Sequence, residues 1–143
     1  MKKLILFFLL LLLCGCNNKI KLSDNYQSAE NLIEIDNKKL LDLEKSKESF
    51  VLFISLPSCP TSSEFRKLLE KFLEKENLSF YHIISTQIDN SKASDAVKYF
   101  PTVIIYDKGK IKTYLKADSE KDEKYYKSLD EFSKWFSKYV SLD

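Results

Sequence analysis

Residues 50–55, with the sequence FVLFIS, form an unbroken apolar run rich in β-branched and aromatic side chains. A strand that is apolar on both faces is covered on both faces, and such strands lie in the middle of a sheet. Cys59, Pro60 and a strongly helical pattern follow within a few residues. We therefore expect an α/β domain with this strand at its centre and a cysteine at the start of the next helix.

The helical pattern after Pro60 is the clearest in the chain. Proline suits the first position of a helix, which makes Cys59 the N-cap. The alternative is a capping box over residues 61–64, which would start the helix one turn later. In both cases Cys59 lies at a helix start. The apolar stripe recurs at helical spacing through Phe65, Leu68, Leu69, Phe72 and Leu73.

The remaining elements are weaker or shorter. With 44% hydrophobic residues the chain can build the core of one domain. Lys108 and Gly109 join two β-rich runs into a hairpin. The pattern predicts a strand at 32–35, a weak helix at 36–49 with Asp36 as N-cap, a strand at 78–84, a short helix or turn at 90–100, the hairpin at 102–115, a solvated loop at 116–125 and a helix at 126–140.

The first sixteen residues have the pattern of a targeting segment. Two lysines precede ten apolar residues, Leu4 to Leu13, which are too few to span about 30 Å of hydrocarbon as a helix. The junction LCGC resembles a bacterial lipobox, and it predicts cleavage after Gly15 and a lipid on Cys16. The alternative is an ordinary secretory signal with two incidental cysteines. We expect a lipoprotein signal peptide at 1–15, a lipidated tether at 16–31 and the folded domain at 32–143.

Removal of this signal changes the charge and the cysteine count. Loss of Lys2 and Lys3 from 23 basic residues leaves 21, against 21 acidic residues, so nothing argues for nucleic-acid binding or a polybasic membrane patch. With Cys14 removed and Cys16 lipidated, Cys59 is the only thiol, and no internal disulfide can form. We expect a monomer held by lipid on the extracytoplasmic face of the cell membrane, with exported proteins or peptides as substrates.

Two motifs, VLFISLPSCPTS and YFPTVIIYDKGK, carry a resemblance to the thioredoxin fold over about residues 32–140. The resemblance implies a central mixed sheet with flanking helices and a cis bond between Phe100 and Pro101. It also implies that Pro101 faces Cys59, and that the backbone of Phe100 pairs with an extended substrate. Pro60 and Thr102, beside these residues, complete the expected binding edge.

The chain departs from the thioredoxin pattern at three positions. The usual Cys-x-x-Cys loop is Cys59-Pro60-Thr61-Ser62, so Ser62 replaces the second thiol. Phe53 stands where many thioredoxins bury a carboxylate, and Ser58 stands where they have tryptophan. These departures disfavour dithiol reduction and leave Ser62 able only to support Cys59 by hydrogen bonding.

Two functions fit this loop. In the first, Cys59 is a nucleophile for monothiol disulfide exchange or isomerisation on exported proteins, because a helix N-terminus favours the thiolate. In the second, the domain is a redox-inactive accessory or binding lipoprotein in peptide or bacteriocin export. The loop and the lipobox also resemble bacteriocin transport accessory proteins. Neither function implies a cofactor.

His82 is the only histidine in the chain. Without a second histidine or a cysteine cluster, we expect no metal site. The alternation of residues 80–84 predicts a half-buried strand histidine, and Cys-His catalysis would require it close to Cys59. The sequence shows no Ser-His-Asp set.

Overall fold

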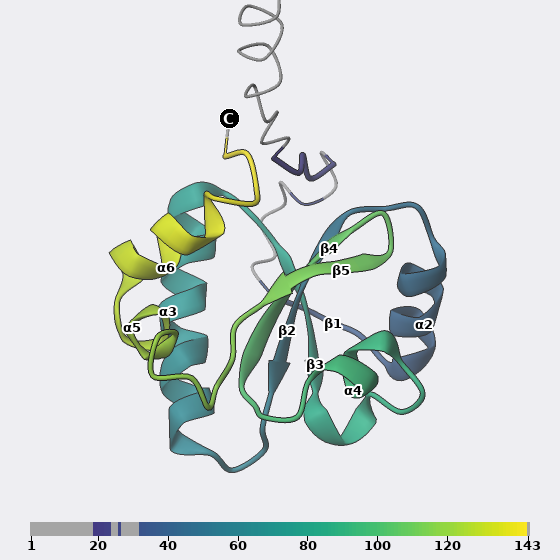
Figure 1. Cartoon of the computed structure of the whole chain (residues 1–143), viewed down its shortest axis with the longest axis horizontal. Coiled ribbons are helices and arrows are strands. Elements are labelled where there is room, and N and C mark those ends of the chain that lie inside the picture. The colour runs from purple at the N-terminus through teal and green to yellow at the C-terminus, as the bar shows by residue number, and fades with distance from the viewer. Residues whose placement is uncertain (1–18, 24–25, 27–31, 143) are drawn as a thin grey trace, which may run out of the picture.

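The computed structural model describes residues 19–23, 26 and 32–142. The predicted signal peptide and the lipidation site at Cys16 lie outside these residues. Within them, a five-stranded sheet has the order β1-β3-β2-β4-β5 (Figure 1). The strands are β1 (Leu32–Glu34), β2 (Phe50–Ser55), β3 (Phe80–Ile84), β4 (Thr102–Asp107) and β5 (Lys110–Tyr114).

The apolar run at residues 50–55 forms β2, the middle strand of the sheet. β2 pairs in parallel with β3 and antiparallel with β4, so the sheet is mixed. Residues 50–54 are fully buried, because helices cover both faces of the strand. Successive side chains of a strand point to opposite faces, and Val51 and Phe53 belong to one hydrophobic cluster while Leu52 and Ile54 belong to the other. The prediction of a central, doubly covered strand is confirmed.

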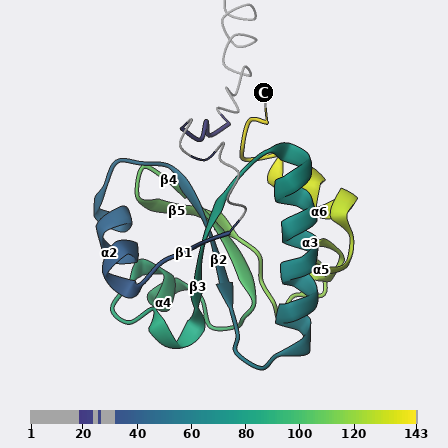
Figure 2. The same cartoon turned by 180° about the vertical axis from the view of Figure 1, so that it is seen from behind.

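Helices form the outer two layers, and both views show the same division (Figures 1 and 2). On one side lies α3, with the helices of the C-terminal part beside it; on the other side lie α2 and α4. Asp36 caps α2 by accepting a hydrogen bond from the backbone N–H of Lys39, as predicted. The bounds are α2 (Asn37–Lys45), α3 (Pro60–Glu76), α4 (Lys92–Ala96), α5 (Glu123–Lys127) and α6 (Leu129–Phe136).

The C-terminal helix predicted at 126–140 is wrong in its extent. Two helices occupy this region, because Ser128 ends α5 and caps α6. The Ser128 backbone is extended, with φ −128° and ψ 122°, and its hydroxyl accepts from the N–H of Glu131. The solvated loop predicted at 116–125 is correspondingly shorter, because its last residues belong to α5.

Part of the segment predicted as a tether packs on the domain. Ile20 is 5% exposed and pairs with Val140 in an isolated parallel bridge, and Tyr26 is 2% exposed. The backbone N–H of Ser79 donates to the carbonyl of Tyr26 at 2.6 Å. The fold therefore includes described residues before Leu32, where the sequence predicted its boundary. No helix in the described part of the chain is long and apolar enough to span a membrane.

Candidate functional site

Cys59 is the N-cap of α3 and is partly exposed. Its side chain makes no capping hydrogen bond, and Pro60 takes the first helical position. The N–H of Ser63 donates to the Cys59 carbonyl at 3.1 Å, which closes the first turn. The prediction of Cys59 as N-cap is confirmed, and the later start at residues 61–64 is wrong. The thiol is thus left beside the unpaired N–H groups of the first turn.

Ser62 fixes the loop before Cys59. Its side chain is buried, and its hydroxyl oxygen accepts from the backbone N–H of Leu56 at 3.0 Å. This bond ties the start of the loop to the first turn of α3. The oxygen expected to support Cys59 is therefore already engaged by the loop backbone, although the hydroxyl proton can still be donated.

The second part of the site is the turn before β4. The bond between Phe100 and Pro101 is cis, as the resemblance implied. The hydroxyl of Tyr126 in α5 donates to the Pro101 carbonyl at 2.9 Å, and burial raises the pKa of Tyr126, so the hydroxyl keeps its proton. Thr102 departs from its expected role in binding. It is fully buried, and its hydroxyl donates to the Leu115 carbonyl at 2.7 Å.

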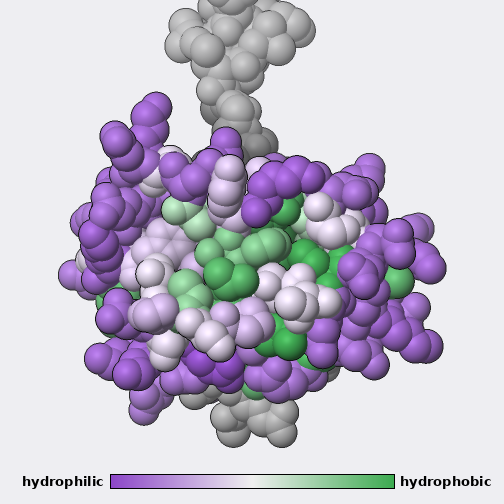
Figure 3. All heavy atoms as spheres, turned by 90° about the horizontal axis from the view of Figure 1, so that it is seen from below, coloured by the Kyte–Doolittle hydropathy of each residue, from purple (hydrophilic) through white to green (hydrophobic). Residues whose placement is uncertain are grey.

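A cavity of about 580 Å³ joins these two parts. Cys59, Phe100, Pro101 and Tyr126 line it, together with the carboxylates of Glu64, Asp118, Glu120 and Glu123. The end of the molecule at which α3 begins carries apolar side chains inside a hydrophilic surround (Figure 3). Large hydrophobic side chains that solvent reaches include Leu56, 39% exposed, and Tyr99, 59% exposed. Such surfaces are typical of sites that bind another molecule.

A further cavity of about 420 Å³ also touches Cys59. Its wall combines the end of β2, the loop and the first turns of α3. Cys59 therefore lines both cavities. The residues around the second cavity are Ser55, Leu56, Ser58, Cys59, Pro60, Ser62, Ser63 and Arg66.

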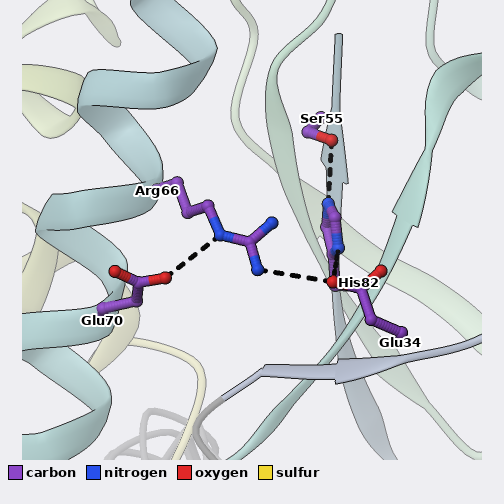
Figure 4. A network of polar contacts seen from close by, with 5 residues as sticks. All are labelled: Glu34, Ser55, Arg66, Glu70 and His82. Carbon is purple, nitrogen blue, oxygen red and sulfur yellow. Dashed lines mark hydrogen bonds and ion pairs between the residues drawn. The ribbon is translucent and has the colours of Figure 1, made fainter. Parts of the chain in front are cut away.

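His82 belongs to a chain of hydrogen bonds that includes Ser55, a residue that lines the second cavity (Figure 4). It is 3% exposed, so the prediction of a half-buried histidine is wrong. Its Nδ1 is 2.6 Å from Glu34 Oε1, and its Nε2 is 2.8 Å from Ser55 Oγ. Burial lowers the pKa of His82, and the neighbouring Glu34 carboxylate opposes that effect. Arg66 in α3 bridges Glu34 and Glu70.

The structure brings together most of the residues singled out in the sequence. Cys59, Phe100 and Pro101 share one cavity, and Pro60 and Ser62 share the other with Cys59. The sequence did not reveal the role of Tyr126, because it was only one of the residues in the predicted C-terminal helix. Among residues 19–23, 26 and 32–142, no group of three or more histidine, cysteine, aspartate or glutamate side chains is arranged to hold a metal ion.

Comparison with solved structures identifies the fold. A crystal structure of the reduced thioredoxin pre-protein of Schistosoma mansoni matches with a TM-score of 0.55 and 16% identity, over 78% of this chain and all of that one. A second structure, described as having a thioredoxin fold, matches with a TM-score of 0.49 and 14% identity, over 68% of this chain and 94% of that one. No family model and no curated protein matches the sequence. The first likeness shows a thioredoxin-like fold.

Proposed function

We propose that this chain is a membrane-anchored lipoprotein that exchanges or isomerises disulfides in exported proteins through the single thiol of Cys59. The observation that carries the proposal is the position of that thiol. Cys59 is partly exposed, lies at the start of α3, and lines a cavity with Phe100 and Pro101. A helix N-terminus stabilises negative charge, which favours the nucleophilic thiolate.

The chemistry follows from having one thiol. The Cys59 thiolate attacks a disulfide of the substrate, a mixed disulfide forms, and one substrate sulfur leaves as a thiolate. Another cysteine of the substrate then attacks the mixed disulfide and releases Cys59. The two steps rearrange disulfides without net oxidation, so they need no second thiol in this chain. Ser62, at the position where a resolving thiol would stand, instead holds the Leu56 backbone.

The membrane location is part of the proposal and rests on the sequence pattern of residues 1–16. A cysteine in a lipobox that receives two acyl chains is anchored stably, whereas a single chain binds a membrane only marginally. Metabolic labelling with a fatty acid tests it, and the expected result is label that disappears in Cys16→Ser. Unlabelled protein, or label that persists in Cys16→Ser, would contradict the anchor without affecting the proposal for Cys59.

A binding function is the second candidate, favoured by the exposed Leu56 and Tyr99 side chains and by the structural use of Ser62. In that case the domain is an accessory lipoprotein that binds a peptide during export, including bacteriocin export. An extended peptide would pair with the backbone at Phe100. Cys59 would then be dispensable.

Capture of partners without reducing agent separates the two functions. The full chain is isolated from membranes after free thiols are blocked, and its complexes are compared with those of Cys59→Ser. Disulfide exchange predicts partners that are released by a reductant and are missing in Cys59→Ser. A set of partners identical in both proteins, and unaffected by reductant, would contradict exchange and support the binding function.

A further inference from the structure

The direction of each hydrogen bond around His82 is determined by chemistry. A carboxylate only accepts, so Nδ1 of His82 carries the proton that is shared with Glu34. In the neutral ring Nε2 is then an acceptor, and the hydroxyl of Ser55 donates to it. The three side chains therefore form a directed chain from a hydroxyl through an imidazole to a carboxylate.

The sheet holds these three groups in place. Glu34 and His82 are register partners on the adjacent parallel strands β1 and β3. The ring of His82 stacks on Phe53 with centroids 5.0 Å apart, and Ser55 lies two residues further along β2, on the same face as Phe53. Strands position side chains more firmly than loops do.

We propose that Ser55, His82 and Glu34 form a nucleophilic site that hydrolyses esters of small carboxylic acids, separate from the chemistry of Cys59. The hydrogen-bonded order of hydroxyl, imidazole and carboxylate is the arrangement that activates serine in unrelated hydrolases, where it is recognised by geometry and not by sequence position. Ser55 is only partly buried and lines the 420 Å³ cavity, so a substrate can reach its hydroxyl.

The wall of the same cavity suits the negative charge that develops during acyl transfer. Among the residues of the first turn of α3 that line it, Pro60 has no N–H and the N–H of Ser63 donates to the Cys59 carbonyl, which leaves the N–H of Ser62 without a partner within the helix. The positive end of a helix dipole stabilises an oxyanion. Arg66 also lines this wall, where its guanidinium is paired with Glu34 and Glu70. Leu56 and Pro60 offer an apolar surface for a short acyl group.

The reaction balances without a cofactor. The oxygen of Ser55 attacks the ester carbonyl while its proton passes to Nε2 of His82, and the Nδ1 proton stays on the ring, hydrogen-bonded to the Glu34 carboxylate. The alcohol leaves with the proton from Nε2, so Ser55 carries the acyl group. Water then attacks the acyl group, gives one proton to Nε2, and releases the acid as Ser55 recovers its hydrogen.

Two probes test the proposal on the full chain in detergent. A fluorophosphonate reacts with activated serines, and p-nitrophenyl acetate releases a coloured alcohol on hydrolysis. We expect the fluorophosphonate to label Ser55, as mapped by peptide mass spectrometry. Ser55→Ala should abolish labelling, and His82→Gln should lower both labelling and ester hydrolysis by about 100-fold, the usual contribution of a general base.

Matched controls come from the same cavity. Ser58 lines it without a hydrogen bond to His82 among the described contacts, so Ser58→Ala should leave labelling unchanged. Cys59→Ser should also leave labelling unchanged, which separates this site from the proposed disulfide exchange. The proposal would be overturned if no fluorophosphonate labels the folded chain, if labelling survives in Ser55→Ala, or if labelling is undiminished in His82→Gln. A far-ultraviolet circular dichroism spectrum of each variant identifies any that fails to fold.

Discussion

At the scale of single residues, the contacts of buried polar groups are the feature of this domain that its sequence pattern reveals least. Glu44 is 5% exposed, and its carboxylate accepts from the backbone N–H groups of Lys92 and Ala93 and from the hydroxyl of Tyr106. Burial raises the pKa of Tyr106, so its hydroxyl remains a donor. One carboxylate thus joins α2, the start of α4 and β4.

Glu44→Ala should be strongly destabilising, because it leaves three donors without their acceptor. At about 1 kcal/mol for each lost hydrogen bond, we expect the free energy of unfolding to fall by about 3 kcal/mol. Urea denaturation measures it. Lys38→Ala is the comparison, since it removes an ion pair between well-exposed side chains of Lys38 and Asp42 on the same helix. It should not change stability measurably, and an equal loss in both variants would refute the role of Glu44.

His82 makes stability depend on pH. Its pKa in the folded protein lies below the ordinary value of 6.5, so the unfolded chain binds a proton first as pH falls. The contribution of His82 is therefore complete above about pH 6.5 and is lost as pH falls through the lowered pKa. Denaturation at about pH 7.5 and about pH 5 should show weaker stability at the lower value. In His82→Gln this difference should shrink, and an unchanged difference would contradict the assignment.

The contacts that could not be predicted from the sequence are those set by the register of the sheet. Cys59, Pro60 and the cis bond at Pro101 were predicted, because each depends on a local pattern or a motif. The neighbours of His82 were not, since the parallel pairing of β1 with β3 joins residues 48 positions apart. No local periodicity encodes which strands become neighbours.

At the scale of elements, the hairpin between β4 and β5 was predicted at Lys108 and Gly109, and the structure confirms it. The sequence did not reveal how closely the turn approaches the end of α2. Lys92 Nζ donates to the carbonyls of both Glu44 and Gly109, at 2.7 and 2.6 Å. The split between α5 and α6 was also missed, because the apolar spacing continues through Ser128 and only its capping hydroxyl marks the break.

Gly109→Ala should destabilise the hairpin by well over about 1 kcal/mol. The backbone has φ +73°, and a Cβ would lie 2.4 Å from the Ser46 carbonyl oxygen and 2.7 Å from that of Glu44. Thermal unfolding measures the loss. The neighbouring Lys108 also has positive φ, +51°. A glycine at this position would adopt that conformation without strain. Lys108→Gly should therefore keep the wild-type melting temperature or raise it, and a similar loss in both variants would refute the steric explanation.

At the scale of the whole molecule, the fold class was the most predictable property. The order of elements and the central strand were sufficient to predict a mixed α/β sheet covered on both faces, and the thioredoxin-like fold is shown by structural likeness. The contribution of residues before Leu32 was missed, because Ile20 and Tyr26 are isolated apolar side chains in a polar stretch without periodicity.

A chain that begins at Leu32 should be less stable than one that begins at residue 17. It lacks the buried side chains of Ile20 and Tyr26, the bridge between Ile20 and Val140, and the hydrogen bond from the Ser79 N–H to the Tyr26 carbonyl. Burial of two such side chains outweighs the cost of ordering them, and we expect a difference of about 2 kcal/mol or more. Urea denaturation of both chains, at matched concentration, measures it. Equal midpoints would show that these residues add nothing to the folded state.

The bridge between Ile20 and Val140 lies at the opposite end of the domain from Cys59 (Figure 1). It places described residues from near both termini together. A bead or sensor surface coupled through the C-terminus would therefore present the cavities beside Cys59 to the solution. Coupling through the side chains at the start of α3 would cover them, so the orientation of an immobilised sample decides whether a partner can be detected at all.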